Sequence, residues 1–335
     1  MLTDLDEAAL WEYRSDHKEP DDFDAFWRDT LAEAAQHPLD ARIVPVETDL
    51  STVEVFDVTF AGFGGHPIRA WLRLPRHRAG RLPGIVQFHG YASGRGHALD
   101  DLLWASAGYA HLLMDVRGQG GDYAGGDTPD PVGSAPSHPG FLTRGIESRE
   151  TYFYRRVFVD AVRAVQVLRE SEHVDPRRVA AVGASQGGGI ALAVAGLVPD
   201  LAALHVQAPF LCDVRRATLI TNAVPYNEIS GYLAARRHSA RRVFDTLGYF
   251  DGIGFARRAT APAWFSAGLM DEVCPPSTAF GAYHAYTGPK HIRVWEYNGH
   301  EAGGPDDLAL VLSAFRTLLL QEPRLLQESR LLEET

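Results

Sequence analysis

Hydrophobic and polar positions along this chain predict a succession of strands and helices. Short apolar runs at residues 53–60 and 68–74 are typical of two strands, and the glycine-rich stretch 62–65 between them predicts a hairpin. Two more compact apolar runs, at residues 83–88 and 110–114, predict further strands with a helix between them. The first third of the chain is therefore expected to contribute several strands to a sheet.

In the second half of the chain, strand and helix patterns alternate regularly. Residues 179–182 form a short apolar run, and the helical pattern of residues 187–195 follows it. Strand patterns recur at residues 263–268 and 292–297, and the second of these precedes a terminal helix. Such alternation is typical of a mostly parallel sheet with helices on both faces. We therefore expect a single α/β domain that spans residues 1–335.

Four segments depart from this alternation. Residues 1–36 carry apolar side chains at helical spacing and predict two amphipathic helices around Pro20. Residues 118–145 are rich in Gly, Pro, Asp and Ser and have no periodicity, and a loop of this length is often functional. Residues 222–252 predict a helical insertion that covers the sheet as a lid, and residues 321–335 predict a polar tail.

The pentapeptide at residues 183–187, Gly-Ala-Ser-Gln-Gly, fits G-x-S-x-G, the turn that presents a nucleophilic serine in α/β-hydrolases. The motif requires a strand, a tight turn and a helix, which is the order predicted here. Gly183 and Gly187 supply the space that a cramped backbone needs around Ser185. Ser185 is therefore a candidate nucleophile rather than an ordinary turn serine.

A serine hydroxyl needs a base within hydrogen-bonding reach, and the base needs a group that orients it. In this fold the acid follows a late strand, and the histidine lies in a loop near the end. Asp271 and His300 follow the last two predicted strands. Either residue alone could be structural, Asp271 as a turn former and His300 as one of 14 histidines. The order Ser185, Asp271, His300, each after a strand, favours a catalytic triad.

Two backbone N–H groups are needed to stabilise the oxyanion that forms during acyl transfer. One is expected from Gln186, directly after the nucleophile, and the other from Tyr91, in the loop after an early strand. His89 begins this loop, and we expect it to hydrogen-bond locally and shape the turn rather than act as a second base.

Three motifs occur in order along the chain: Arg117-Gly118-Gln119, the pentapeptide around the serine, and His300-Glu301. In order and spacing they resemble the signature of carbohydrate esterase family 7, the acetyl xylan esterase / cephalosporin C deacetylase family. The resemblance runs over nearly the full length of the chain. The arginine follows a strand at the edge where ligands gather in α/β sheets, and we expect it to tie loops together rather than to bind substrate.

The resemblance implies a metal-free deacetylase without a cofactor that acts on small acetylated sugars and on acetylated cephalosporins. It also implies a ring-shaped hexamer. Carried over to this chain, it makes Ser185 the nucleophile, His300 the base and Asp271 the residue that orients the base. Pro225 and Tyr226 belong to a segment that resembles the lining of the substrate pocket.

Two other classes of function remain open at this point. A general short-chain carboxylesterase or a peptidase on the same fold would carry the same triad, because a fold does not determine the substrate. A non-catalytic binding protein built on this fold would usually lack a member of the triad, and none is missing from the sequence.

Composition and charge narrow the range of partners. The chain is 45% hydrophobic and 22% charged, which is ordinary for a soluble protein. Its net charge of −11 and its lack of a basic tract argue against nucleic acid as a partner. Two cysteines make neither a disulfide framework nor a zinc site. The acidic N-terminus does not fit a secretory signal, and the apolar stretch 308–320 is interrupted by Arg316. We therefore expect a cytoplasmic protein that does not enter membranes.

Overall fold

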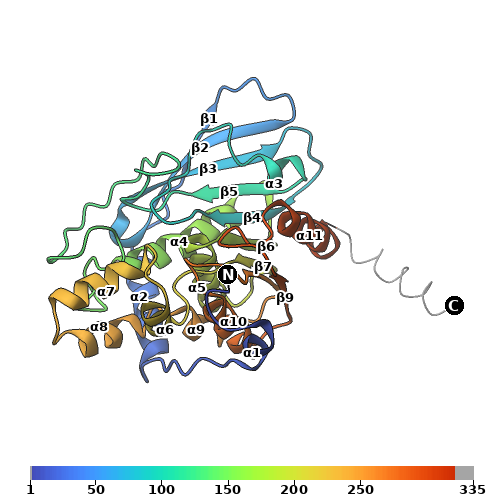
Figure 1. Ribbon diagram of the computed structural model, residues 1–335. Helices are drawn as coiled ribbons and strands as arrows, with labels where there is room; N and C mark the ends of the chain where they lie inside the picture. Colours follow the sequence, from blue (N-terminus) through green and yellow to red (C-terminus); the bar gives the residue numbers. More distant parts are fainter. Residues whose placement is uncertain (1, 321–335) are drawn as a thin grey trace.

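A nine-stranded sheet runs through the computed structural model, which describes residues 2–320 (Figure 1). The predicted polar tail at residues 321–335 lies outside the described residues. The strands are β1 (Arg42–Val46), β2 (Val53–Ala61), β3 (Pro67–Pro75), β4 (Leu82–Phe88), β5 (Ala110–Met114), β6 (Val174–Ala184), β7 (Ala203–Gln207), β8 (Ala263–Gly268) and β9 (Lys290–Trp295). In space they follow the order β1-β2-β3-β5-β4-β6-β7-β8-β9.

The sheet is antiparallel at one end and parallel over the rest. β1, β2, β3 and β5 pair antiparallel in succession, and a short 3-10 turn, η1 (Phe63–Gly65), joins β2 to β3 as the predicted hairpin. From β5 through β4 to β9, every neighbouring pair is parallel. The carboxyl ends of parallel strands meet at one edge of a sheet, where functional groups collect. This is the α/β-hydrolase fold, so the predicted fold class is confirmed.

Helices occupy the remaining chain and cover both faces of the sheet (Figure 1). They are α1 (Glu7–Glu12), α2 (Phe23–Ala34), α3 (Leu103–Ser106), α4 (Phe153–Glu170), α5 (Gln186–Leu197), α6 (Val214–Ile220), α7 (Tyr226–Ala235), α8 (Ala240–Leu247), α9 (Gly252–Ala256), α10 (Pro276–Ala285), α11 (Pro305–Phe315) and the π-helical turn η2 (Arg316–Leu320). None of the helices within residues 2–320 is both long and apolar enough to cross a membrane.

The two faces of the sheet bury different sets of side chains. Phe88 of β4 packs in the larger core, together with α4 and α5. Ile85 of the same strand points to the other face, where it packs with Trp104 of α3 and Phe315 of α11. Because successive side chains of a strand point to opposite faces, a strand covered on both sides is apolar over most of its length. This burial explains the mostly apolar sequences of the central strands.

The sequence pattern did not predict strand β1. All five of its residues, Arg42 to Val46, are exposed or only partly buried, and it pairs with β2 alone at the edge of the sheet. A strand that buries neither face has no alternation to detect. Pro45 also weakens any strand signal, since proline is found in sheets mainly on edge strands.

The long loop after β5 is held to the body of the protein by buried ion pairs. Arg117 is fully buried, and its guanidinium donates two hydrogen bonds to Asp160 of α4, at 2.6 and 2.8 Å. The same guanidinium contacts Asp130, in the middle of the loop, at 3.4 Å. Burial acts to lower the pKa of Arg117, but attraction to Asp160 and Asp130 outweighs it and raises the pKa. The arginine is therefore charged and ties the loop to α4.

Replacement of Arg117 by alanine is expected to lower the free energy of unfolding by about 3–5 kcal/mol, because it leaves the buried carboxylate of Asp160 without its cation. Asp130 keeps a second cation, Arg156, at 2.8 Å. Urea unfolding followed by circular dichroism measures this loss. Arg28→Ala is the matched control, because its partner Asp29 and Arg28 itself are about 70% exposed, and it should cost at most about 1 kcal/mol. Equal midpoints for the two variants would contradict the prediction.

Candidate active site

Ser185 lies in a strained turn between β6 and α5. Its backbone has φ 55° and ψ −122°, a conformation that non-glycine residues rarely adopt. The turn closes so tightly that a Cβ added to Gly183 would lie 2.2 Å from the backbone of Gly187, and one added to Gly187 would lie 2.0 Å from the carbonyl oxygen of Phe88. The two glycines are therefore required, and the turn places the hydroxyl of Ser185 at the carboxyl edge of the sheet.

The three predicted triad residues come together at this edge. Nε2 of His300 lies 2.8 Å from Oγ of Ser185, and Nδ1 of His300 lies 2.9 Å from Oδ2 of Asp271. The two loops that carry Asp271 and His300 follow the neighbouring strands β8 and β9. The parallel pairing of β6, β7, β8 and β9 brings together side chains that lie 115 and 29 positions apart in the sequence.

Backbone N–H groups fix the carboxylate of Asp271. Its side chain is buried, and Oδ1 accepts hydrogen bonds from the N–H groups of Val273 at 2.8 Å and Cys274 at 2.9 Å. Oδ2 is thereby left to face His300. Glu301 holds the loop that carries His300, because its Oε1 accepts hydrogen bonds from the Asn298 side chain and from the N–H of Gly299. The hydrogen bond from Asn298 is the main cause of the lowered pKa of Glu301.

Beside Ser185, the two predicted oxyanion donors are held by a pair of glutamines. Gln186 opens α5, so its N–H has no acceptor within the helix. Its side-chain amide pairs reciprocally with that of Gln119 at 2.9 and 3.0 Å, and Nε2 also lies 3.3 Å from the carbonyl oxygen of Gly90. Gln119 accepts a hydrogen bond from the N–H of Ala92 at 2.8 Å.

The contact between the Gln186 side chain and the carbonyl oxygen of Gly90 also orients the N–H of Tyr91. The carbonyl of Gly90 and the N–H of Tyr91 belong to one peptide unit, and in a trans peptide they point in opposite directions. A donor that holds the carbonyl therefore turns the N–H of Tyr91 away from the glutamine pair. Among residues 2–320, no backbone acceptor for this N–H is found. The geometry leaves it available to a ligand.

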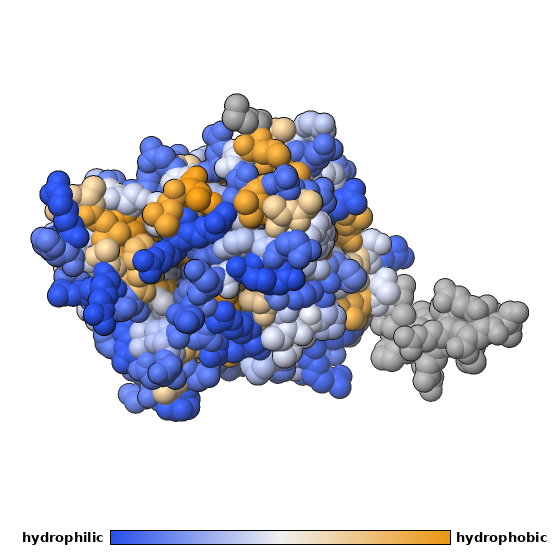
Figure 2. All heavy atoms as spheres, turned by 60° about the horizontal axis from the view of Figure 1, so that its bottom comes forward, coloured by the Kyte–Doolittle hydropathy of each residue, from blue (hydrophilic) through white to orange (hydrophobic). Residues whose placement is uncertain are grey.

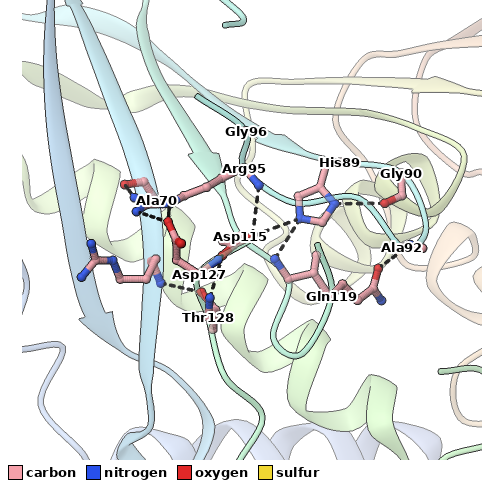
Figure 3. A network of polar contacts seen from close by, with 12 residues as sticks. Ala70, His89, Gly90, Ala92, Arg95, Gly96, Asp115, Gln119, Asp127 and Thr128 are labelled. Atoms are coloured by element: carbon pink, nitrogen blue, oxygen red, sulfur yellow. Dashed lines mark hydrogen bonds and ion pairs between the residues drawn. The ribbon is translucent and has the colours of Figure 1, made fainter. Parts of the chain in front are cut away.

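His89 and Asp115 fix the oxyanion loop, residues 89–96, through contacts with Gly90 and Arg95 (Figure 3). The N–H of Val116 donates to Nε2 of His89 at 2.9 Å, which places the ring proton on Nδ1, 3.0 Å from the carbonyl oxygen of Gly90. Asp115 accepts hydrogen bonds from three backbone N–H groups, one in the oxyanion loop and two in the long loop. Burial acts to raise the pKa of Asp115, but the hydrogen bonds from these N–H groups lower it. His89 therefore shapes the turn.

An aromatic cluster, formed by Tyr91, Phe141, Phe210 and Tyr226, lies beside the loop. The ring of Tyr91 contacts Phe141 at 5.5 Å and Phe210 at 6.0 Å, measured between ring centroids. Its hydroxyl donates to Glu228 of α7 at 2.6 Å, so the helical insertion is bonded to the oxyanion loop. Burial raises the pKa of Tyr91 and that of Glu228.

The structure does not bring the two predicted pocket residues to an open surface. Pro225 and Tyr226 are buried at the start of α7. The ring of Tyr226 packs on Phe210 at 4.6 Å. The backbone of Phe210, in turn, donates a hydrogen bond to the carbonyl oxygen of Ser185 at 2.9 Å. Tyr226 therefore forms a second layer behind Phe210.

Cys274 lies next to the hydroxyl of Ser185, a contact that sequence reasoning left without a role. The thiol is buried, and burial raises its pKa well above the ordinary value, while a hydrogen bond with Ser185 acts in the opposite direction. The thiol is therefore neutral at physiological pH, and a neutral thiol is a weak nucleophile. Cys274 therefore contributes a small apolar surface beside Ser185.

Comparison with known proteins places this geometry in a family. Residues 1–311 match the model of the family described as acetyl xylan esterase (AXE1). The chain belongs to this acetyl xylan esterase family. It is thus a member of a family of carboxylic ester hydrolases, and the resemblance seen in the sequence motifs is confirmed.

Individual proteins that are similar to this chain are themselves named acetyl xylan esterases or acetyl esterases. An acetyl xylan esterase from Paenibacillus sp. R4 is 37% identical, with 94% of this chain and all of that chain covered and a TM-score of 0.89. Acetyl xylan esterase 1 from Thermoanaerobacterium sp. JW/SL YS485 is 34% identical, with coverages of 92% and 98% and a TM-score of 0.85. Acetyl esterase Axe7A from Xylanibacter ruminicola is 28% identical over 84% of this chain, which spans 64% of that protein's length.

The change Gln119→Leu is expected to lower kcat for an acetyl ester by about 10- to 100-fold with little change in KM. The N–H of Tyr91 remains but loses part of what orients it, so the loss should be smaller than for removal of an oxyanion donor. Steady-state kinetics on p-nitrophenyl acetate measures both constants. Gln166→Leu, on the exposed side of α4, is the matched control. A variant that loses thermal stability but keeps kcat would show a structural role only.

Proposed function

We propose that this chain hydrolyses acetyl esters through an acetyl-enzyme intermediate on Ser185. The observation that carries the proposal is the continuous hydrogen-bond chain from Asp271 through His300 to Ser185, at the carboxyl edge of the sheet in a member of an esterase family. The side chains have the contacts that nucleophile activation needs.

In the proposed cycle, His300 takes the proton of Ser185 as the hydroxyl attacks the acetyl carbonyl. The N–H groups of Tyr91 and Gln186 stabilise the oxyanion, and His300 returns the proton to the departing alcohol. Water, activated by the same histidine, then releases acetate. Asp271 holds the ring with its proton on Nδ1 and stabilises the imidazolium that forms. No step requires a metal or a cofactor.

The close packing of the aromatic cluster favours substrates with a short acyl group. Phe210 is fully buried, and its contacts with Tyr91 and Tyr226 leave it little freedom to move aside. A close-packed wall resists the entry of extra methylene groups.

Hydrolysis rates for p-nitrophenyl esters from acetyl to octanoyl test this part of the proposal. A steep preference for acetyl, absent in Ser185→Ala, is the expected result. A preference for longer chains would instead favour a general short-chain carboxylesterase, and cleavage of peptides would favour a peptidase.

Acetylated xylo-oligosaccharides and esters like cephalosporin C are the proposed substrates, on the strength of the sequence motifs and of the names of the relatives. Release of acetate from each compound tests them directly.

We also propose a cytoplasmic homo-oligomer, by resemblance a hexamer. The face that carries the N-terminal helices is mostly hydrophilic with separate hydrophobic patches (Figure 2). Leu219 is 80% exposed and Val224 is 59% exposed, which fits burial against another copy. Sedimentation at micromolar concentration would give the mass of one chain if this proposal is wrong.

A further inference from the structure

A cavity of about 240 Å³ that contains several polar side chains reaches Ala184, next to the nucleophile, and the steps proposed above do not use it. Its wall includes His89 and Gly90 of the oxyanion loop and Ala184, the exposed residue directly before Ser185. The side chains of Gln87, Ser93, Asp100 and Asp101 also line it.

The cavity and the aromatic cluster lie on opposite sides of the oxyanion loop. Gln87 precedes Phe88 on β4, and successive strand residues point to opposite faces. Phe88 belongs to the core against which Tyr91 packs, so Gln87 and the cavity lie toward the face covered by α3 and α11. An ester bound at Ser185 has an acyl side and an alcohol side. If the acyl group meets the aromatic cluster, the alcohol meets this cavity.

The side chains in the cavity suit a ligand rich in hydroxyl groups. Nε2 of Gln87 lies 3.5 Å from Oδ1 of Asp101, a contact at the limit of hydrogen bonding that leaves both groups able to bond a ligand. Asp101 forms no ion pair with another residue of the described range 2–320, so its carboxylate keeps its capacity to accept hydrogen bonds. An amide, a carboxylate and a hydroxyl together both donate and accept.

An exposed tyrosine, Tyr123, directly precedes Ala124, which lines the cavity. Tyr123 is 89% exposed and has φ 55°, an outlier for a bulky residue. The rim is fixed in place, because the N–H of Asp122 donates to the carbonyl oxygen of Ala92 and the N–H of Gly96 donates to that of Gly125. Residues with such backbone strain are enriched at active sites and ligand sites. A flat apolar face beside polar groups suits a sugar ring, which has an apolar face and polar edges.

We propose that this cavity binds the alcohol part of the ester, a sugar unit whose hydroxyls bond to Gln87 and Asp101 and whose ring stacks on Tyr123. The inference rests on the proposed acetyl esterase function for the position of the scissile bond. Binding of the sugar itself requires no hydrolysis, so the two ideas can fail separately.

The test compares Gln87→Leu, Asp101→Asn and Tyr123→Ser with the unaltered chain. Calorimetry with xylobiose, the free alcohol, measures binding without catalysis. Kinetics with acetylated xylobiose and with p-nitrophenyl acetate, whose leaving group has no hydroxyl to place, gives a selectivity ratio. Each variant is expected to weaken xylobiose binding and to lower that ratio by about 3- to 30-fold, the effect of one lost hydrogen bond or ring contact.

Two controls make the result specific. Gln166→Leu should change neither quantity, because Gln166 lies on the exposed side of α4. Tyr297→Ser tests an alternative position for the sugar, at a second exposed tyrosine. Tyr297 is 75% exposed and lies three residues before His300.

The site is refuted if Tyr297→Ser abolishes xylobiose binding while the three cavity variants keep it. It is also refuted if the chain cleaves acetyl esters but xylobiose does not bind. Binding of xylobiose that the cavity variants lose, in a chain without esterase activity, would support the site and reject the proposed function.

Discussion

Replacement of Ser185 by alanine is expected to reduce kcat for p-nitrophenyl acetate by about 10⁴- to 10⁶-fold and to leave the fold intact. The hydroxyl is the group that Nε2 of His300 contacts at 2.8 Å, so its loss removes the nucleophile and leaves the base without a proton to take. Alanine fits the turn, because the tight approaches there involve Gly183 and Gly187 rather than the hydroxyl. Residual activity would come from the oxyanion donors alone.

Two control measurements allow the effect of Ser185→Ala to be interpreted. Ser106→Ala, at an exposed position of α3, is the matched control and should keep full activity. Circular dichroism should show the same thermal midpoint for both variants within a few degrees. Near-normal turnover by Ser185→Ala would reject the proposed mechanism, and so would a covalent organophosphate label on any other residue.

The change Asp271→Asn should reduce kcat by about 10⁴-fold, and the structure gives the reason. Oδ1 of Asp271 accepts hydrogen bonds from two backbone N–H groups, those of Val273 and Cys274. The asparagine oxygen must take that place, so the NH₂ group must face Nδ1 of His300. The histidine then carries its proton on Nε2, toward Ser185, and cannot act as the base.

Glu272→Gln is the control for that change, because Glu272 is the next residue and its side chain is exposed. It removes the same charge from the same loop and should alter kcat by less than about twofold, as expected for a surface substitution. Similar losses in the two variants would mean that net charge near the site, and not the histidine tautomer, governs the rate.

Much of the fold follows from local patterns. The central strands β4, β5 and β8 were predicted closely, because burial on both faces forces their sequences to be mostly apolar. Edge strand β1 escaped prediction for the converse reason, since it is almost wholly exposed. The glycines of the serine turn were predicted correctly as a steric requirement, which the 2.2 and 2.0 Å approaches explain.

The parts of the site that sequence reasoning missed all depend on contacts between distant segments. Gln119 and Gln186 stand 67 positions apart, and only the folded sheet makes them a pair. Glu228 stands 137 positions from Tyr91 and gave no signal as a partner. Tyr226, predicted to line the substrate pocket, is fully buried, and its ring packs on Phe210. Local patterns give a residue type and an element, but not the side-chain neighbours of that residue.

The sequence by itself determined the fold class, the order of the chemical groups and the family. It could do so because alternation of burial, steric need for glycine and position after a strand are properties of short segments. Tertiary structure alone decided how the Gly90–Tyr91 peptide is turned and which residues form a second layer. It also decided that a polar cavity, with Gln87 and Asp101 in its wall, opens beside Ser185. These features depend on the packing of the loops that follow β4, β5, β6 and β7 at one edge of the sheet, and no single segment encodes that packing.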